Sequence, residues 1–293
     1  MSPFAFALVI LAGLIHACWN IAAKKAKGDA RFAFFTSVCM MVVWAPIGWW
    51  AGREVVPGWG VAAWGIVAAS GILHVLYFVV LLRGYRRADL TVVYPVARGS
   101  GPLISSAVAI VLLGEHLSAL GAIGILGVAV GVFMIAGGVG MLRLAHDPQR
   151  CARLHTGLRY GLATGAFIAA YTVLDGYAVK VMLLSPILVD YMGNFVRVVL
   201  LAPVALHDRP ATAALWRSQW KYALLVGTIS PVSYVLVLYA MQTAPLSHVA
   251  PAREVSMLFA ALIGGRLLGE GDRVQRLLGA LCIAAGVTAL GLG

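Results

Sequence analysis

Two arginines lie within long apolar stretches of the chain. Arg98 belongs to residues 88–115, which read ADLTVVYPVARGSGPLISSAVAIVLLGE, and Arg253 to residues 244–270, which read APLSHVAPAREVSMLFAALIGGRLLGE. A guanidinium is planar and always charged, so it suits a carboxylate or phosphate. A charge within a membrane span costs at least ~2.5 kcal/mol, so it seldom faces lipid. Both arginines are therefore candidates for contact with an anionic ligand, unless each instead bonds backbone carbonyls freed by a nearby proline.

Three further residues could balance these charges or carry a proton. Glu254 directly follows Arg253 and either neutralises an arginine or titrates, because burial favours the protonated form of a carboxyl group. Asp175 is a second candidate for proton coupling, although a position near the interface would leave it merely solvated. His248 is a third, three residues before Pro251.

Polar and aromatic residues within other apolar stretches could form the wall of a binding cavity. His16 and Asn20 are four residues apart, so on a helix they share one face, with Trp19 beside them. Any one such side chain more often bonds a neighbouring helix than a substrate. The expected cavity wall consists of His16, Trp19, Asn20, Tyr77, Tyr94 and Tyr234.

The composition indicates an all-α integral membrane protein. Of the 293 residues, 61% are hydrophobic and 11% are charged, with a mean hydropathy of +0.92. Soluble domains have about 25% charged residues. The net charge of +11 comes from short basic clusters between apolar runs, which is typical of topology determinants rather than of a nucleic-acid-binding surface. We expect a lipid bilayer and a small-molecule substrate as partners, and no nucleic acid.

Apolar segments long enough to cross a bilayer recur along the whole chain, each close to the roughly 20 residues that a span needs. They predict about ten transmembrane helices, at residues 3–23, 32–51, 60–82, 90–114, 117–137, 158–179, 185–206, 222–241, 246–268 and 274–292.

The two arginine-bearing stretches are also copies of one another. One gap after the proline aligns Ala88, Leu90, Pro95, Arg98 and Gly114-Glu115 with Ala244, Leu246, Pro251, Arg253 and Gly269-Glu270. We interpret residues 1–137 and 158–293 as two five-helix repeats joined by a connecting loop at 138–157. An odd number of helices inverts the second repeat, an arrangement typical of secondary transporters. Glu115 and Glu270 are expected to be structural turn residues.

Lysine and arginine residues predict the orientation of the chain. They cluster in the loops after odd-numbered helices, whereas the loops after even-numbered helices contain only Arg53 and Lys180. By the positive-inside rule the odd loops are cytoplasmic, so both termini are extracytoplasmic in a multi-pass inner (plasma) membrane protein.

Several catalytic patterns are absent from the sequence. There is no Gly-x-x-x-x-Gly-Lys phosphate loop, no cluster with metal-ligand spacing and no Gly-x-Ser-x-Gly elbow. We therefore expect no ATP hydrolysis, no metal, no cofactor and no enzyme activity. A membrane-embedded enzyme acting on lipid-linked groups, the less favoured alternative, would need clustered acids or histidines at an interface.

The chain resembles the EamA family of the drug/metabolite transporter superfamily. The resemblance rests on the two five-helix repeats, on the Pro-x-x-Arg and Pro-x-Arg fourth helices that end in Leu-Gly-Glu, and on the segment His16-Ala17-Cys18-Trp19-Asn20. It implies alternating access around a central cavity lined by helices three, four, eight and nine together with one and six, and it favours efflux. Glu254 departs from the first copy, which has Gly99 after its arginine.

These observations together predict a secondary transporter that exports small polar metabolites with an anionic group, such as amino acids or organic acids. A proton is a candidate coupling ion, and the sequence makes no prediction of the oligomeric state. The alternative is a broad-specificity exporter of cationic drugs, which would bind through Glu254, Asp175 and the aromatic residues.

Overall fold

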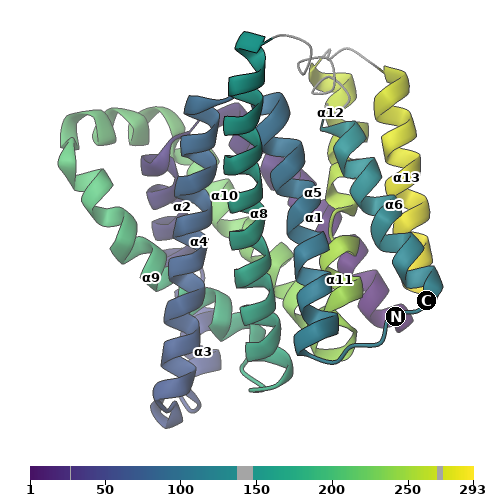
Figure 1. Ribbon diagram of the computed structural model, residues 1–293. Coiled ribbons are helices and arrows are strands. Elements are labelled where there is room, and N and C mark those ends of the chain that lie inside the picture. Colours follow the sequence, from purple (N-terminus) through teal and green to yellow (C-terminus); the bar gives the residue numbers. More distant parts are fainter. Residues whose placement is uncertain (27, 137–147, 269–272) are drawn as a thin grey trace.

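The computed structural model describes residues 1–26, 28–136, 148–268 and 273–293, and the regular elements in these ranges are all helices (Figure 1). The first half contains α1 (Pro3–Ala26), α2 (Ala30–Val43), α3 (Ala45–Gly52), the short 3-10 helix η1 (Val56–Gly58), α4 (Val61–Arg87), α5 (Leu90–Leu112) and α6 (Ala119–Ile135). The second contains α8 (Pro148–Lys180), α9 (Pro186–His207), α10 (Arg209–Thr243), α11 (Leu246–Ala252), α12 (Val255–Leu268) and α13 (Arg273–Leu292).

Each of the ten predicted spans corresponds to one helix or one broken pair. Within the described ranges, eight helices are long and apolar enough to cross a membrane, or nine if the bent pair α2 and α3 is one span. Helix α6 is also apolar but has only 17 residues. The chain bends by 58° between α2 and α3, and a second break separates α11 from α12. The prediction of an all-helical membrane protein is confirmed.

Two helices extend beyond their predicted limits. Helix α8 begins at Pro148, inside the stretch predicted to be a loop, and α10 begins at Arg209, well before residue 222. Both extensions are rich in polar residues, which hydropathy excludes from a span but which a helix outside the hydrocarbon tolerates. Residues 148–157 of the predicted connecting loop are therefore helical, while the boundaries of the two domains stay a prediction.

The helices of the two halves pack in a pattern that is symmetric under exchange of the halves. Helix α1 packs against α10 and α12, and its counterpart α8 packs against α4 and α5. Likewise α2 packs against α10, and its counterpart α9 packs against α4. Helix α1 begins at the end of the bundle where both termini lie, whereas α8 begins at the opposite end (Figure 1). The halves therefore cross in opposite directions, as the inverted repeats predicted.

Glycines bring the last helix of each half into direct backbone contact. A Cβ atom added to Gly131 of α6 would lie 2.5 Å from the carbonyl oxygen of Gly279 on α13. One added to Gly286 of α13 would lie 2.7 Å from the carbonyl oxygen of Gly124. Small residues are the usual means of close helix packing in membranes. This contact joins the two repeats, and at the paired termini the Met1 ammonium donates to the Gly291 carbonyl at 3.0 Å.

Candidate functional site

The break between α11 and α12 places a charged pair inside the protein. Pro251 has no backbone N–H, so it cannot continue the hydrogen-bond ladder of a helix. After Pro251 the backbone hydrogen bonds join residues three positions apart instead of four. The Glu254 N–H donates to the Pro251 carbonyl at 3.0 Å, and the Ser256 N–H donates to the Arg253 carbonyl at 3.2 Å. Arg253 and Glu254 form this non-helical turn between the two helices.

Glu254 joins the two predicted arginines into one cluster. Its Oε2 lies 2.7 Å from Nη2 of Arg98 on α5, and its Oε1 lies 3.7 Å from Nε of Arg253. The Glu254 side chain is 1% exposed, whereas those of Arg98 and Arg253 are 17% and 13% exposed. The structure therefore shows the ion pairs expected for Glu254, and it leaves the side chains of both arginines partly exposed.

The two arginine-bearing spans differ in a way that the repeat did not indicate. Helix α5 continues unbroken from Leu90 to Leu112 through Pro95 and Pro102, whereas the second copy is interrupted after Pro251. The structure shows the Arg98 guanidinium paired with Glu254, and the described hydrogen bonds include none from Arg98 to a backbone carbonyl.

Aromatic side chains extend the cluster away from Arg253. Arg253 donates from Nη2 to the Tyr171 hydroxyl at 3.2 Å, and its guanidinium also lies 5.9 Å from the Tyr171 ring centroid. The His74 ring stacks on Tyr171 with centroids 4.0 Å apart, and the Tyr77 centroid lies 5.8 Å from that of Tyr171. Neither Tyr171 nor His74 is among the residues of the expected cavity wall.

Asp175 is buried rather than solvated near an interface. Asp175 is 1% exposed, and the Tyr234 hydroxyl on α10 donates a hydrogen bond to its Oδ2. The Tyr234 ring meets His74 edge-on at 5.6 Å, which connects this pair to the aromatic cluster. The interpretation of Asp175 as a solvated interfacial residue is wrong, and Tyr234 is the partner of an acid within the protein interior.

The other predicted wall residues lie at different distances from the cluster. His16 lies in the neighbourhood of both Arg98 and Arg253, and Tyr77 and Tyr94 lie near Arg98. Trp19 meets His16 edge-on at 4.6 Å but packs against a separate apolar cluster that includes Phe32 and Cys39. Asn20 is partly buried one turn after His16, and no described hydrogen bond joins it to either arginine.

His248 lies elsewhere. Its Nδ1 is 3.3 Å from the Ser247 hydroxyl. Its Nε2 faces Gly121 of α6, because a Cβ atom added to that glycine would lie 3.0 Å from it. The structure therefore places His248 at the contact between α11 and α6, apart from the arginines.

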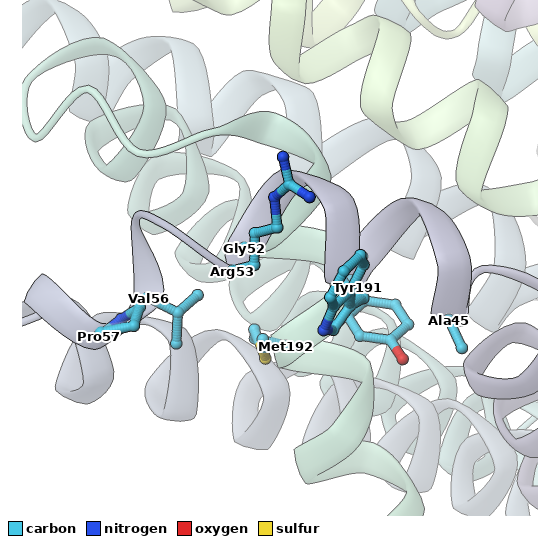
Figure 2. A pocket seen from close by; sticks show the side chains of 9 residues that line it. Ala45, Gly52, Arg53, Val56, Pro57, Tyr191 and Met192 are labelled. Carbon is cyan, nitrogen blue, oxygen red and sulfur yellow. The ribbon is translucent and has the colours of Figure 1, made fainter.

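A pocket of about 460 Å³ opens on another part of the protein (Figure 2). It lies between α3, η1 and α9, and Figure 2 shows Tyr191 at its centre. Its lining consists of Ala45, Gly48, Trp49, Gly52, Arg53, Val56, Pro57, Tyr191 and Met192. This lining contains none of the predicted site residues, so a central cavity beside the arginines stays a prediction.

Comparisons with known proteins agree with this architecture. Among the solved structures that match is a crystal structure with a TM-score of 0.73 and 15% sequence identity, covering 98% of this chain and 98% of that chain. At that identity the likeness shows the fold alone. No curated protein matches the chain. The sequence profile of the EamA-like transporter family matches residues 3–137 and again residues 155–292, one match in each half. The chain therefore belongs to the EamA-like transporter family.

Proposed function

We propose that this transporter exports small polar metabolites with an anionic group, such as amino acids or organic acids, by alternating access. The cluster of Arg98, Arg253 and Glu254 carries the proposal. Two guanidinium groups and one carboxylate leave one positive charge in excess at a place where an uncompensated charge is costly. A bound monoanion would compensate this charge.

The exposure of the three side chains supports the same substrate class. The carboxylate is enclosed, while the side chains of both arginines are partly exposed, which leaves them open to contact with a ligand. The alternative, a cationic drug, would need a free carboxylate. Glu254 already has two cationic partners, so it offers a cation little attraction.

Counterflow in proteoliposomes tests this proposal. The purified protein is reconstituted and loaded with unlabelled L-alanine, L-glutamate, L-malate or glucose 6-phosphate, and entry of the same labelled compound is followed. We expect exchange of at least one of them, and a tenfold or greater loss of exchange for Arg98→Lys. Lysine keeps the charge but lacks the planar fork that binds a carboxylate in a bidentate manner.

Arg53→Lys is the matched control, because Arg53 is 46% exposed, lies far from the cluster in the sequence, and contacts the exposed residues Glu54 and Trp49. We expect this variant to exchange its substrate like the wild type. The cationic alternative would be favoured if exchange occurred only with organic cations, was tolerant of Arg98→Lys and was abolished by Glu254→Gln.

The proposal includes an orientation in the plasma membrane. The C-terminal ends of α1 and α4 carry Lys24, Lys25, Arg86 and Arg87, and they lie at the end of the bundle opposite the termini. The positive-inside rule makes that end cytoplasmic and both termini extracytoplasmic. Antibody labelling of a C-terminal epitope tag on intact spheroplasts tests this, and labelling only after permeabilisation would reverse the orientation.

A further inference from the structure

Asp175 is a buried acid whose environment differs from that of the other acids in the protein interior. Its Oδ2 accepts a hydrogen bond from Tyr234, and its Oδ1 has no hydrogen-bond partner. In the described part of the chain no lysine or arginine forms an ion pair with it. Glu254 and Asp190, by contrast, each contact an arginine, at 2.7 Å and 2.9 Å respectively.

The groups around Asp175 come from three other helices and supply no net positive charge. Helix α4 contributes the Ser70 hydroxyl beside the carboxyl group, and α10 contributes Tyr234. Helix α9 contributes Arg197 and Asp190, which act on Asp175 with opposite sign. These two form an ion pair with each other at 2.9 Å, so the charge of Arg197 already has a partner.

The remaining titratable groups nearby are aromatic. His74 on α4 packs against Tyr234, and Tyr171 lies one turn before Asp175 on α8. Neither provides a fixed positive charge. A carboxylate in such a place loses its hydration without gaining a counter-ion, whereas the neutral acid avoids most of that cost. A proton on Asp175 is the simplest way to balance this site.

We propose that Asp175 is the proton-binding site through which this protein couples transport to a pH gradient. Glu254 is less suited to that role, because it already contacts two guanidinium groups. The inference rests on the proposed transport function and adds the coupling ion and the residue that carries it.

A continuous series of contacts joins Asp175 to the proposed substrate site. Tyr234 bonds Asp175 and meets His74, His74 stacks on Tyr171, and Tyr171 accepts a hydrogen bond from Arg253. The members lie on α8, α10 and α4 and at the break after α11. Because the series crosses between helices of both halves, relative motion of the halves would disturb it.

A shift of α10, which packs against α1 and α2, away from α8, which packs against α4 and α5, would release the proton. Movement of α10 relative to α8 separates the Tyr234 hydroxyl from Asp175 and lets water reach the carboxyl group. Hydration favours the ionised form, so the proton passes to the water on the side that has opened. Return of the helices requires that a proton is bound again, which makes proton movement part of the transport cycle.

Infrared spectroscopy of the purified full-length protein tests the proton site without any substrate. At pH 7 we expect a C=O stretching band from a protonated carboxyl group in the wild type, and loss of this band in Asp175→Asn. Asp208→Asn is the matched control, because the Asp208 side chain is 43% exposed at the start of α10. Asp208→Asn and Glu254→Gln should both keep the band.

Tyr234→Phe provides a second variant if Asp175→Asn does not fold. It removes one hydroxyl and leaves the carboxyl group in place, so the band should persist and move to higher frequency as its hydrogen bond is lost. A band that survives Asp175→Asn, that disappears in Glu254→Gln, or that is unaffected by Tyr234→Phe would overturn the assignment.

Transport measurements test the coupling. With whichever of the four labelled compounds exchanges in counterflow, wild-type proteoliposomes should accumulate the compound in response to an imposed pH gradient. Asp175→Asn should retain counterflow and lose the response to the gradient at least tenfold, while Asp208→Asn keeps both. Equal responses of Asp175→Asn and wild type would overturn the proposal. Absence of counterflow in the wild type would count against the proposed substrates, and the infrared result would still decide the proton site.

Discussion

Glu115, at the end of the first arginine-bearing span, caps the start of the second at Ser247. Its Oε2 accepts a hydrogen bond from the Ser247 backbone N–H at 2.8 Å, and its Oε1 accepts one from the Leu246 N–H at 2.8 Å. The Lys180 ammonium, at the end of α8, lies 2.9 Å from the same Oε1. One side chain thus ties the loop after α5 to two helices of the other half, α8 and α11.

These bonds set the protonation of Glu115, which lies outside the spans. Burial by itself raises the pKa of its carboxyl group, but the hydrogen bonds from Ser247, Lys180 and Leu246 outweigh burial and hold that pKa below its ordinary value. A carboxyl group with a lowered pKa in the folded state stabilises the fold above its unfolded pKa of about 4.3. The stabilisation is lost as the pH falls through the folded pKa.

Glu115→Gln is therefore expected to destabilise the protein by about 2 kcal/mol at pH 7, since bonds to a charged acceptor are weakened. Thermal unfolding in detergent should give a lower melting temperature for the variant than for the wild type at pH 7. The two melting temperatures should converge when the pH falls below about 4. Glu54→Gln is the control, because Glu54 is 81% exposed. A difference in melting temperature that is independent of pH would show that the shape of the Glu115 side chain, rather than its charge, stabilises the protein.

The cap on α11 could not have been found from the sequence. Glu115 and Leu246 are 131 positions apart, and no local pattern around either indicates the other. The same residue was expected only to end a turn, and its repeat counterpart Glu270 lies outside the described residues. Hydropathy identified the spans because a bilayer requires a fixed length of apolar chain, which is a local property.

Which side chains are buried inside the bundle depends on which helices pack together, so the sequence could not predict this either. From the sequence alone Asp175 could equally have lain at the membrane interface, whereas the structure packs Tyr234 of α10 against it. Pro95 and Pro251 occupy matching positions, yet only the second interrupts its span. A proline always removes one backbone donor, but neighbouring helices decide how the chain accommodates the loss.

The contact between α6 and α13 predicts a strong effect of one added methyl group. Gly131→Ala would place a Cβ atom 2.5 Å from the Gly279 carbonyl oxygen, so the two helices must separate. We expect a loss of about 1–3 kcal/mol, the usual cost of overpacking. Gly65→Ala on α4 is the control, because no atom lies within 4 Å of its added Cβ. Equal melting temperatures for the two variants would contradict the close contact.

Arg197 is predicted to be indispensable for folding although it lies outside the arginine cluster. Its Nη2 lies 2.9 Å from Oδ1 of Asp190, whose side chain is 4% exposed. Arg197→Gln leaves that carboxylate buried without a counter-ion, which costs about 3–5 kcal/mol. Arg53→Gln breaks only an exposed pair, worth about 0–1 kcal/mol. Thermal unfolding of both variants should separate these two magnitudes.

The Arg98 and Glu254 pair can be tested by a double-mutant cycle. Glu254→Gln leaves two guanidinium groups without their shared carboxylate, and Arg98→Gln weakens the compensation of a carboxylate that is 1% exposed. We expect each single change to destabilise the protein by about 3 kcal/mol or more, as for other buried pairs that lose one partner.

The double variant removes one charge of each sign, so it should be more stable than the sum of the single effects predicts. A coupling energy of about 2 kcal/mol, measured by thermal unfolding, is expected for side chains in direct contact. Additive effects would mean that the two residues act independently. If the excess positive charge binds anions, L-glutamate or L-malate should also raise the melting temperature of the wild type more than that of the double variant. The folding and binding roles of the cluster are then measured on the same proteins.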